Sequence, residues 1–391
     1  MKYVREFIHL LRSGLTDEKY ELPKGFKLEK ALEEFFKHSV VAIAYMGALN
    51  CGFKKDEAAM QLMFKQYMKE MFISENQMFE VEKVYKAFEE NGIDFMPVKG
   101  CNMKSLYPSP EMRAMGDADI LIKDEQYSLV SKVMKNIGYS YEREGNHDYS
   151  WDSKGLHVEL HFKLIRAYTS EYEKYFGNGW NLAKYHEGHK YYMSHEDEFV
   201  YIFIHYTKHF RNGGIGCRHI VDLWVYLRSY PNMDFDYIEN IMERLEVKEF
   251  YLNTMDLLEY WFNDGKSNEK IEYMTSYIME SGNWGSDKNI ALSRGVQAMQ
   301  EENINAENKL SLIKRLAFPV NDEMTTRYSI LNKAPFLLPF MWVRRWYDVV
   351  KLNRNKVKEC VKLVSNKSNN ELNEFEENFR KVGLTFDFKE K

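Results

Sequence analysis

Two aspartates lie one residue apart within a run of mostly apolar residues, MRAMGDADILI. This run predicts a half-buried β-strand, in which successive side chains point to opposite faces, so Asp117 and Asp119 share one face. Two like charges about 7 Å apart on such a face are unfavourable unless water reaches both or a cation lies between them. Carboxylate oxygens suit Mg²⁺ or Mn²⁺. A metal site and a solvated strand edge therefore both fit the pair.

An upstream stretch, FMPVKGCNMKSLYPSP, contains features that suit a phosphate group. Its apolar strand leads through Lys99 and Gly100 into a short predicted helix. A glycine at such a junction lets backbone N–H groups approach a phosphate, and a helix N-terminus favours its negative charge. Arg113, in the loop before the aspartates, has a planar guanidinium that can hold a phosphate with two hydrogen bonds. Each feature also has an ordinary explanation, a tight turn for the glycine and a surface position for the arginine.

The stretch LHVELHF, residues 156–162, alternates apolar and polar side chains. His157, Glu159 and His161 share one face of the predicted strand. An iron site of two histidines and one carboxylate would need all three around one ion. We exclude that site, because the outer two residues are about 13 Å apart along the strand, too far to share a metal at ~2 Å. Glu159 is instead expected to join the two aspartates as a third carboxylate from a neighbouring strand.

Three zones of different periodicity must position these residues. Apolar residues recur every three or four positions from residue 7 to about residue 91, which predicts helices. Between about residues 93 and 166, short strands alternate with helical pieces, and helical periodicity then returns. We predict an α+β fold, in which a core with a small mixed β-sheet at residues 92–190 lies between helical regions at residues 1–91 and 191–391.

Composition and charge exclude several classes of protein. The chain has 391 residues, enough for two or three domains, and its 54 Lys and Arg against 59 Asp and Glu give a net charge of -5. This balance does not favour nucleic acid as a partner, although a local basic patch would still allow it. The four cysteines are far apart, which argues against a disulfide framework and a cysteine zinc site. No signal peptide is evident and the longest apolar runs are about half of the ~20 residues of a membrane span, so we predict a cytoplasmic protein without a transmembrane segment.

Three blocks of the chain, taken in order, closely resemble bacterial nucleotidyltransferase family proteins, a largely uncharacterised branch of the DNA polymerase β-like nucleotidyltransferase superfamily. The blocks are VKGCNMKSLYPSPEMRAMGDADILI, HVELHF and FIHYTKHFRNGGIGCRHIVDLWVYL, and the resemblance covers about residues 95–227. It implies a nucleotidyltransferase core in which Asp117, Asp119 and Glu159 are catalytic and hold two Mg²⁺ or Mn²⁺ ions. The nucleotide-binding residues that it implies are Lys99, Gly100, Cys101, Arg113, Lys208, His209 and Arg218.

The resemblance implies that a nucleoside monophosphate moves from an NTP to a hydroxyl group of a small molecule, sugar, protein or RNA, with release of pyrophosphate. Glu159 is a candidate to assist deprotonation of that hydroxyl. Cys101 follows Gly100 where the superfamily usually has Gly-Ser. The alternative is therefore a non-catalytic nucleotide- or partner-binding protein with the same fold. A third hypothesis, hydrolysis of a phosphoester by the same carboxylates, would release phosphate instead of pyrophosphate.

The block HYTKHFRNGGIGCRHIVD has two interpretations. His205 and His209 are four residues apart on one predicted helix face, and Arg218 and Asp222 repeat this spacing after a glycine break. The first interpretation is a lid whose Lys208, His209 or Arg218 contacts the nucleotide. The second is a structural Arg218–Asp222 pair with a capped histidine. A zinc site is less favoured, because no acid or cysteine lies at H-E-x-x-H-type spacing.

A basic and aromatic stretch lies near the C-terminus. Its aromatic residues are Trp342, Trp346 and Tyr347, and its basic residues are Arg344, Arg345, Lys351, Arg354, Lys356 and Lys358. Such a stretch suits contact with RNA, a lipid surface or a partner protein. It is more typical of a helix with one packed face and one solvated face.

Overall fold

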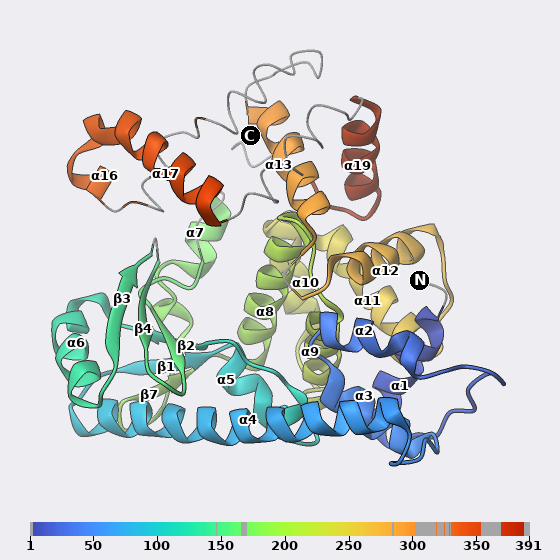
Figure 1. Cartoon of the computed structure of the whole chain (residues 1–391). Helices are drawn as coiled ribbons and strands as arrows, with labels where there is room; N and C mark the ends of the chain where they lie inside the picture. The colour runs from blue at the N-terminus through green and yellow to red at the C-terminus, as the bar shows by residue number, and fades with distance from the viewer. Residues whose placement is uncertain are drawn as a thin grey trace.

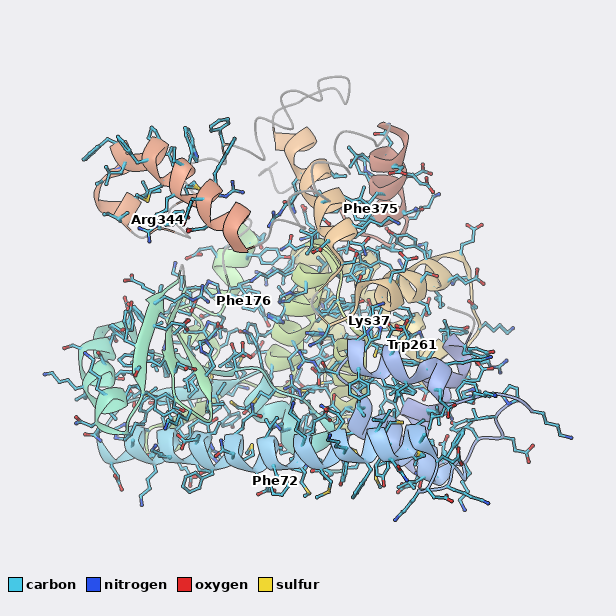
Figure 2. All side chains as sticks on the ribbon, in the orientation of Figure 1. Lys37, Phe72, Phe176, Trp261, Arg344 and Phe375 are labelled. Atoms are coloured by element: carbon cyan, nitrogen blue, oxygen red, sulfur yellow. The ribbon has the colours of Figure 1, made fainter. Side chains whose placement is uncertain are left out.

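In the computed structural model, a β-sheet and a helical body lie side by side along one long helix, α4 (Figure 1). With 33 residues at 1.5 Å each, α4 is about 50 Å long, which lets it contact both parts. Phe72 projects from its outer side, 68% exposed (Figure 2). The structure describes residues 3–145, 147–165, 170–283, 285–301, 318, 324, 328, 330–352 and 369–386.

The N-terminal helices pack closely because two of them meet at glycines. A Cβ atom on Gly14 of α1 would lie 2.0 Å from the carbonyl oxygen of Ile43, and one on Gly47 of α3 would lie 1.8 Å from that of Leu10. Glycine at both positions therefore allows the two backbones to touch. The helices of this region are α1 (Val4–Thr16), α2 (Glu29–Lys37), α3 (Val41–Asn50) and α4 (Ala58–Glu90).

Seven strands of the described residues form one mixed sheet in the order β3-β4-β5-β2-β1-β7-β6. The central strand β2 is antiparallel to β1 and parallel to β5. The predicted α+β class with a mixed sheet is confirmed. Strands β6 and β7 were not predicted, because their exposed and half-exposed residues lack an apolar alternation. The strands are β1 (Phe95–Val98), β2 (Ala118–Ile122), β3 (Ser140–Glu144), β4 (Asp148–Asp152), β5 (His157–His161), β6 (Lys184–Glu187) and β7 (Lys190–Tyr192).

The two faces of the sheet pack against different layers. Ile120 of β2 belongs to a hydrophobic cluster that contains Phe88 of α4 and Val133 of α6. Leu121 belongs to a second, larger cluster that reaches into the helical body. Because side chains alternate, Asp119 shares the face of Leu121, toward the helical body. The short helices of the sheet region are α5 (Gly100–Met103), α6 (Tyr127–Asn136), α7 (Ser170–Phe176), and the 3₁₀ turns η1 (Lys104–Leu106), η2 (Pro110–Met112), η3 (Asp124–Gln126) and η4 (Trp180–Leu182).

The helical body combines residues from both ends of the chain. The larger cluster contains Phe35 of α2, Phe203 of α8 and Leu258 of α11. The two predicted helical regions thus share one hydrophobic core, and the domain boundaries after residues 91 and 190 stay a prediction. The remaining helices are α8 (His195–Arg211), α9 (Cys217–Ser229), α10 (Phe235–Arg244), α11 (Lys248–Phe262), α12 (Glu269–Ser281), α13 (Asp287–Glu301), α16 (Ile330–Lys333), η5 (Pro335–Leu337), α17 (Leu338–Leu352) and α19 (Asn369–Lys381).

Helix α17 contains the first part of the basic and aromatic stretch. The rings of Trp342 and Trp346 contact the ring of Phe318, with centroids 5.2 and 5.4 Å away. Arg344 lies on this helix near one edge of the molecule (Figure 2). Three basic residues of the stretch lie outside the described residues, namely Arg354, Lys356 and Lys358. Across the described ranges, the helices lack the combination of length and apolar character that crossing a membrane requires.

Candidate active site

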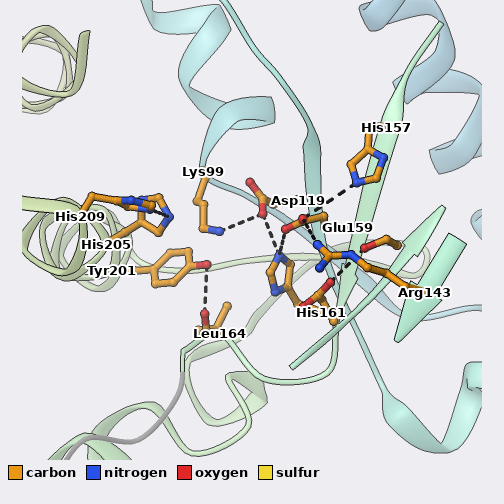
Figure 3. Close-up of polar contacts among 12 residues, drawn as sticks. Lys99, Asp119, Arg143, His157, Glu159, His161, Leu164, Tyr201, His205 and His209 are labelled. Atoms are coloured by element: carbon orange, nitrogen blue, oxygen red, sulfur yellow. Dashed lines mark hydrogen bonds and ion pairs between the residues drawn. The ribbon is translucent and has the colours of Figure 1, made fainter. Parts of the chain in front are cut away.

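The register of three strands brings acidic and basic side chains to one level of the sheet. Asp119 on β2 lies directly opposite Glu159 on the parallel strand β5. On the other side, Asp119 pairs with Val98, the last residue of β1, so Lys99 follows at the same level. Figure 3 shows these side chains meeting on the side of the sheet that faces Tyr201 of α8. Strand register therefore assembles the centre of the site.

Asp119, Glu159 and His161 form a group whose ligand atoms all lie within 4.8 Å of one another. The predicted set contained Asp117 instead of the histidine. The structure places Asp117 just before β2, in a pocket beside Asp119. Sequence reasoning missed His161 because it considered only an ion shared with His157. Alternation already placed His161 on the face of Glu159, and the neighbouring strand supplies the third ligand.

One carboxylate oxygen of Asp119 contacts two side chains, a lysine and a histidine. The ammonium of Lys99 donates a hydrogen bond to Asp119 Oδ1 over 2.8 Å. The same oxygen lies 2.7 Å from His161 Nε2. Burial by itself would raise the pKa of Asp119, but Lys99 and His161 outweigh it and hold the pKa below its ordinary value. Asp119 is therefore an ionised carboxylate although it is only 4% exposed.

The pKa values of the two other carboxyl groups are shifted in the opposite direction. Burial raises the pKa of Glu159 above its ordinary value, and the negative charge of Asp119 adds to this. Asp117 has a raised pKa for the same two reasons. A further positive charge would favour ionisation of both groups. The donor set around Asp119 can hold a divalent ion, since its carboxylate oxygens suit Mg²⁺ or Mn²⁺, while its imidazole is a ligand more typical of transition metals.

A pocket adjoins this group on the side of α5 and α9. Its volume is about 70 Å³, well below the ~300 Å³ of a small-molecule site, so it accommodates only part of a nucleotide. Six of the predicted site residues line it: Lys99, Gly100, Arg113, Asp117, Asp119 and Arg218. With Asp222, which also lines it, the pocket combines three carboxylates with three basic side chains.

Close packing favours glycine at position 100, the start of α5. A Cβ atom at this position would lie 3.0 Å from Nη1 of Arg113 and 3.3 Å from the side chain of Met115. The side chain of Cys101 points elsewhere, into the cluster between the sheet and α4. Burial raises the pKa of its thiol to about 12. The difference between Gly-Cys and Gly-Ser thus lies on the buried side of this turn.

Arg113 is buried and firmly held, which contradicts the surface position considered for it. Its Nε and Nη2 donate to the two carboxylate oxygens of Asp222 over 2.9 and 3.1 Å. The hydroxyl of Tyr107 donates to the same carboxylate over 2.6 Å. This leaves Nη1 directed at Gly100 in the pocket. Asp222 therefore positions the guanidinium with one nitrogen toward the phosphate site expected from the sequence.

Lys208 and Arg218 approach the site from α8 and α9. Desolvation lowers the pKa of Lys208, while the negative charges of Glu159 and Asp148 act in the opposite direction. Arg218 donates from Nη1 to the carbonyl oxygen of Ala114 over 2.5 Å. The structural Arg218–Asp222 pair considered from the spacing is wrong, because Asp222 pairs with the arginine at position 113 instead.

Three histidines of α8 and α9 lie near one another. His205 Nε2 and His209 Nε2 are 3.1 Å apart, and the ring centres of His205 and His219 are 6.4 Å apart. Desolvation and the charge of Lys99 lower the pKa of His205 well below its ordinary value. The zinc alternative gains no support here. Among the described residues, the group around Asp119 is the one set of three potential ligands with all donor atoms within 4.8 Å.

Comparison with known proteins identifies a family that the chain matches. A family model described as an uncharacterised nucleotidyltransferase matches residues 25–263, more than half of the chain. The match includes all three blocks on which the sequence resemblance rests, and it extends into the N-terminal helices and to α11. No curated protein and no solved structure matches the chain.

Proposed function

The chain belongs to the uncharacterised nucleotidyltransferase family, and on this premise we propose that it is a Mg²⁺- or Mn²⁺-dependent enzyme that transfers a nucleoside monophosphate from an NTP to a hydroxyl group. The observation that supports the proposal most directly is the register of Asp119 opposite Glu159 on adjacent parallel strands. Asp117, just before β2, lies beside Asp119 in the adjoining pocket. Three carboxyl groups thus converge where phosphates and a metal would meet.

In the proposed step, the acceptor oxygen forms a bond to the α-phosphorus of the NTP. The bond from that phosphorus to the oxygen that bridges to the β-phosphorus breaks, and pyrophosphate leaves with the electron pair. Glu159, which lies opposite Asp119 on the neighbouring strand, accepts the hydroxyl proton. When bound, the divalent metal neutralises phosphate charge and lowers the pKa of the acceptor hydroxyl.

The basic residues of the pocket bind the triphosphate in this proposal. Arg113 directs positive charge into the pocket, and Lys99, whose ammonium contacts Asp119, lines the same pocket beside Gly100. Because Asp222 already fixes the guanidinium of Arg113, that group needs little reorganisation when a phosphate arrives. Lys208 and His209 of α8 are proposed to contact the nucleotide from the facing side, together with Arg218 of α9.

A second candidate function is binding of a nucleotide without turnover. The contacts of Asp119 favour it, because Lys99 and His161 already compensate this carboxylate. Like charges that are compensated within the protein can persist without a metal. Retention of the carboxylates therefore does not by itself distinguish an enzyme from a binding protein.

Calorimetric titration tests the proposed site. Purified protein is titrated with non-hydrolysable analogues of ATP, CTP, GTP and UTP, with and without Mg²⁺, alongside Asp119→Asn and Glu159→Gln. Asp124→Asn is the matched control, since Asp124 follows the far end of the same strand β2 and is exposed. We expect Mg²⁺-dependent binding of one analogue, lost in the two site variants and retained in the control. Equal binding by all four proteins would refute the site.

Turnover is then tested with the NTP that binds. Release of pyrophosphate and labelling of a hydroxyl compound by an α-³²P-labelled NTP support the transferase. Binding without any product in the presence of candidate sugars, RNA and proteins supports the second candidate. Release of phosphate instead of pyrophosphate identifies a hydrolase that uses the same carboxylates.

A further inference from the structure

Lys99 has a backbone conformation that lysine rarely adopts. Its φ is 50° and its ψ is -116°, at the junction of β1 and α5. A non-glycine residue in such a region is strained and persists only where its surroundings require it. A glycine would adopt this conformation without strain, but the glycine of this junction is the next residue, Gly100. The strained position is therefore occupied by a long charged side chain. This combination indicates that the side chain of Lys99 has a specific task.

The side chain of Lys99 reaches the carboxylate at the centre of the metal-binding group. Its ammonium is 2.8 Å from Asp119 Oδ1, the same oxygen that contacts His161. The ring of Tyr201 on α8 lies 5.6 Å from the ammonium and provides a second favourable contact. Only 15% of the lysine side chain is exposed. Lys99 therefore places a fixed positive charge on the carboxylate oxygen that is also a potential metal ligand.

A divalent ion and the ammonium cannot share Asp119 Oδ1 at low cost. An ion bonded to this oxygen at about 2.1 Å would lie against the ammonium, and their positive charges would repel strongly in a partly buried site. For the ion to bind this oxygen, Lys99 must leave it. Its nearest alternative is the adjoining pocket, which Lys99, Gly100 and Arg113 line together. An anionic phosphate in this pocket would receive the displaced ammonium.

We propose that Lys99 is an internal counter-ion that excludes a metal from Asp119 until a triphosphate in the adjoining pocket takes over the ammonium. The metal and the nucleotide consequently bind together, and neither binds tightly alone. This inference rests on the proposed function and concerns how the same site is regulated. It also explains why the basic side chain lies on the carboxylate and not free in the pocket.

The test measures the affinities for Mn²⁺ and for tripolyphosphate, which removal of the Lys99 ammonium is expected to change in opposite directions. Binding of Mn²⁺ without nucleotide is followed by electron paramagnetic resonance, and binding of inorganic tripolyphosphate without metal by calorimetry. In Lys99→Met, we expect Mn²⁺ affinity to rise about 10- to 100-fold, the equivalent of the charge-assisted hydrogen bond that no longer competes. Tripolyphosphate affinity is expected to fall at least about tenfold. General damage to the fold would instead lower both affinities.

Lys123→Met is the matched control. Lys123 follows β2 and forms a comparable ion pair, 2.6 Å from Asp94, away from the candidate site. This variant is expected to leave both affinities unchanged. If Lys99→Met does not fold, Lys99→Gly replaces it, since glycine tolerates the positive φ and also lacks the ammonium.

The outcomes separate this inference from the proposed function. Asp119→Asn reports whether Mn²⁺ binds at the carboxylate at all. If wild type binds Mn²⁺, Asp119→Asn does not, and Lys99→Met has the affinity of wild type, the counter-ion role is wrong while the metal site stands. If neither wild type nor Lys99→Met binds Mn²⁺, both the counter-ion role and the metal-dependent function are wrong.

Discussion

The buried pair of Arg113 and Asp222 leads to the sharpest prediction about stability. Their side chains are 8% and 5% exposed, and two nearly parallel hydrogen bonds join them. Asp222→Ala leaves a guanidinium charge buried without its partner and removes the acceptor of the Tyr107 hydroxyl. Breaking a buried ion pair in this way costs about 3–5 kcal/mol. We expect urea denaturation to show a loss of this size in the free energy of unfolding.

A double variant separates the charge from the packing. In Arg113→Met/Asp222→Leu, both charges are removed, so no unpaired charge remains and most of the stability is expected to return. The exposed pair of Lys270 and Glu249, 2.9 Å apart, is the control, and Glu249→Ala is expected to cost less than about 1 kcal/mol. A cost below about 1 kcal/mol for Asp222→Ala, or a double variant less stable than both single variants, would refute this reasoning.

The remaining predictions concern the site and one helix crossing. Glu159→Gln is expected to stabilise the metal-free protein at neutral pH. The pKa of Glu159 is raised in the folded state, so the contribution of its protonated form to stability is lost as the pH rises through that pKa. Thermal unfolding from pH 4 to 8 checks this, and the gain should vanish below the unfolded-state pKa of about 4.3. Gly100→Ala is expected to weaken nucleotide binding about tenfold in calorimetry, since the new Cβ presses on Arg113 Nη1, which its ion pair prevents from moving. Gly47→Ala is expected to cost about 1–3 kcal/mol in urea denaturation, because its Cβ would meet the rigid carbonyl of Leu10.

Local patterns in the sequence identified the elements and the faces of the candidate site. Alternation placed Ile120 and Leu121 on opposite faces of β2, and the two hydrophobic clusters agree with this. The same alternation placed Asp117 and Asp119 on one face of their strand and Glu159 on the polar face of its own. Helical periodicity outside the sheet region predicted the mostly helical remainder. These properties are readable because the side-chain period of a strand or helix is a local consequence of backbone geometry.

Contacts between distant segments depended on the tertiary structure. Arg113 and Asp222 are 109 positions apart, and no local pattern indicates that helix α9 brings them together. The contact of Lys99 with Asp119 depends on the register of β1 with β2 and on the unusual φ of Lys99. The sequence does not predict a positive φ at a lysine. His161 became a potential ligand only when the neighbouring strand β2 brought Asp119 to it and Glu159. The sequence alone therefore determined which residues have the required chemistry. Strand register and helix packing decided which of them meet, because contact depends on the relative positions of elements, and local periodicity does not encode these positions.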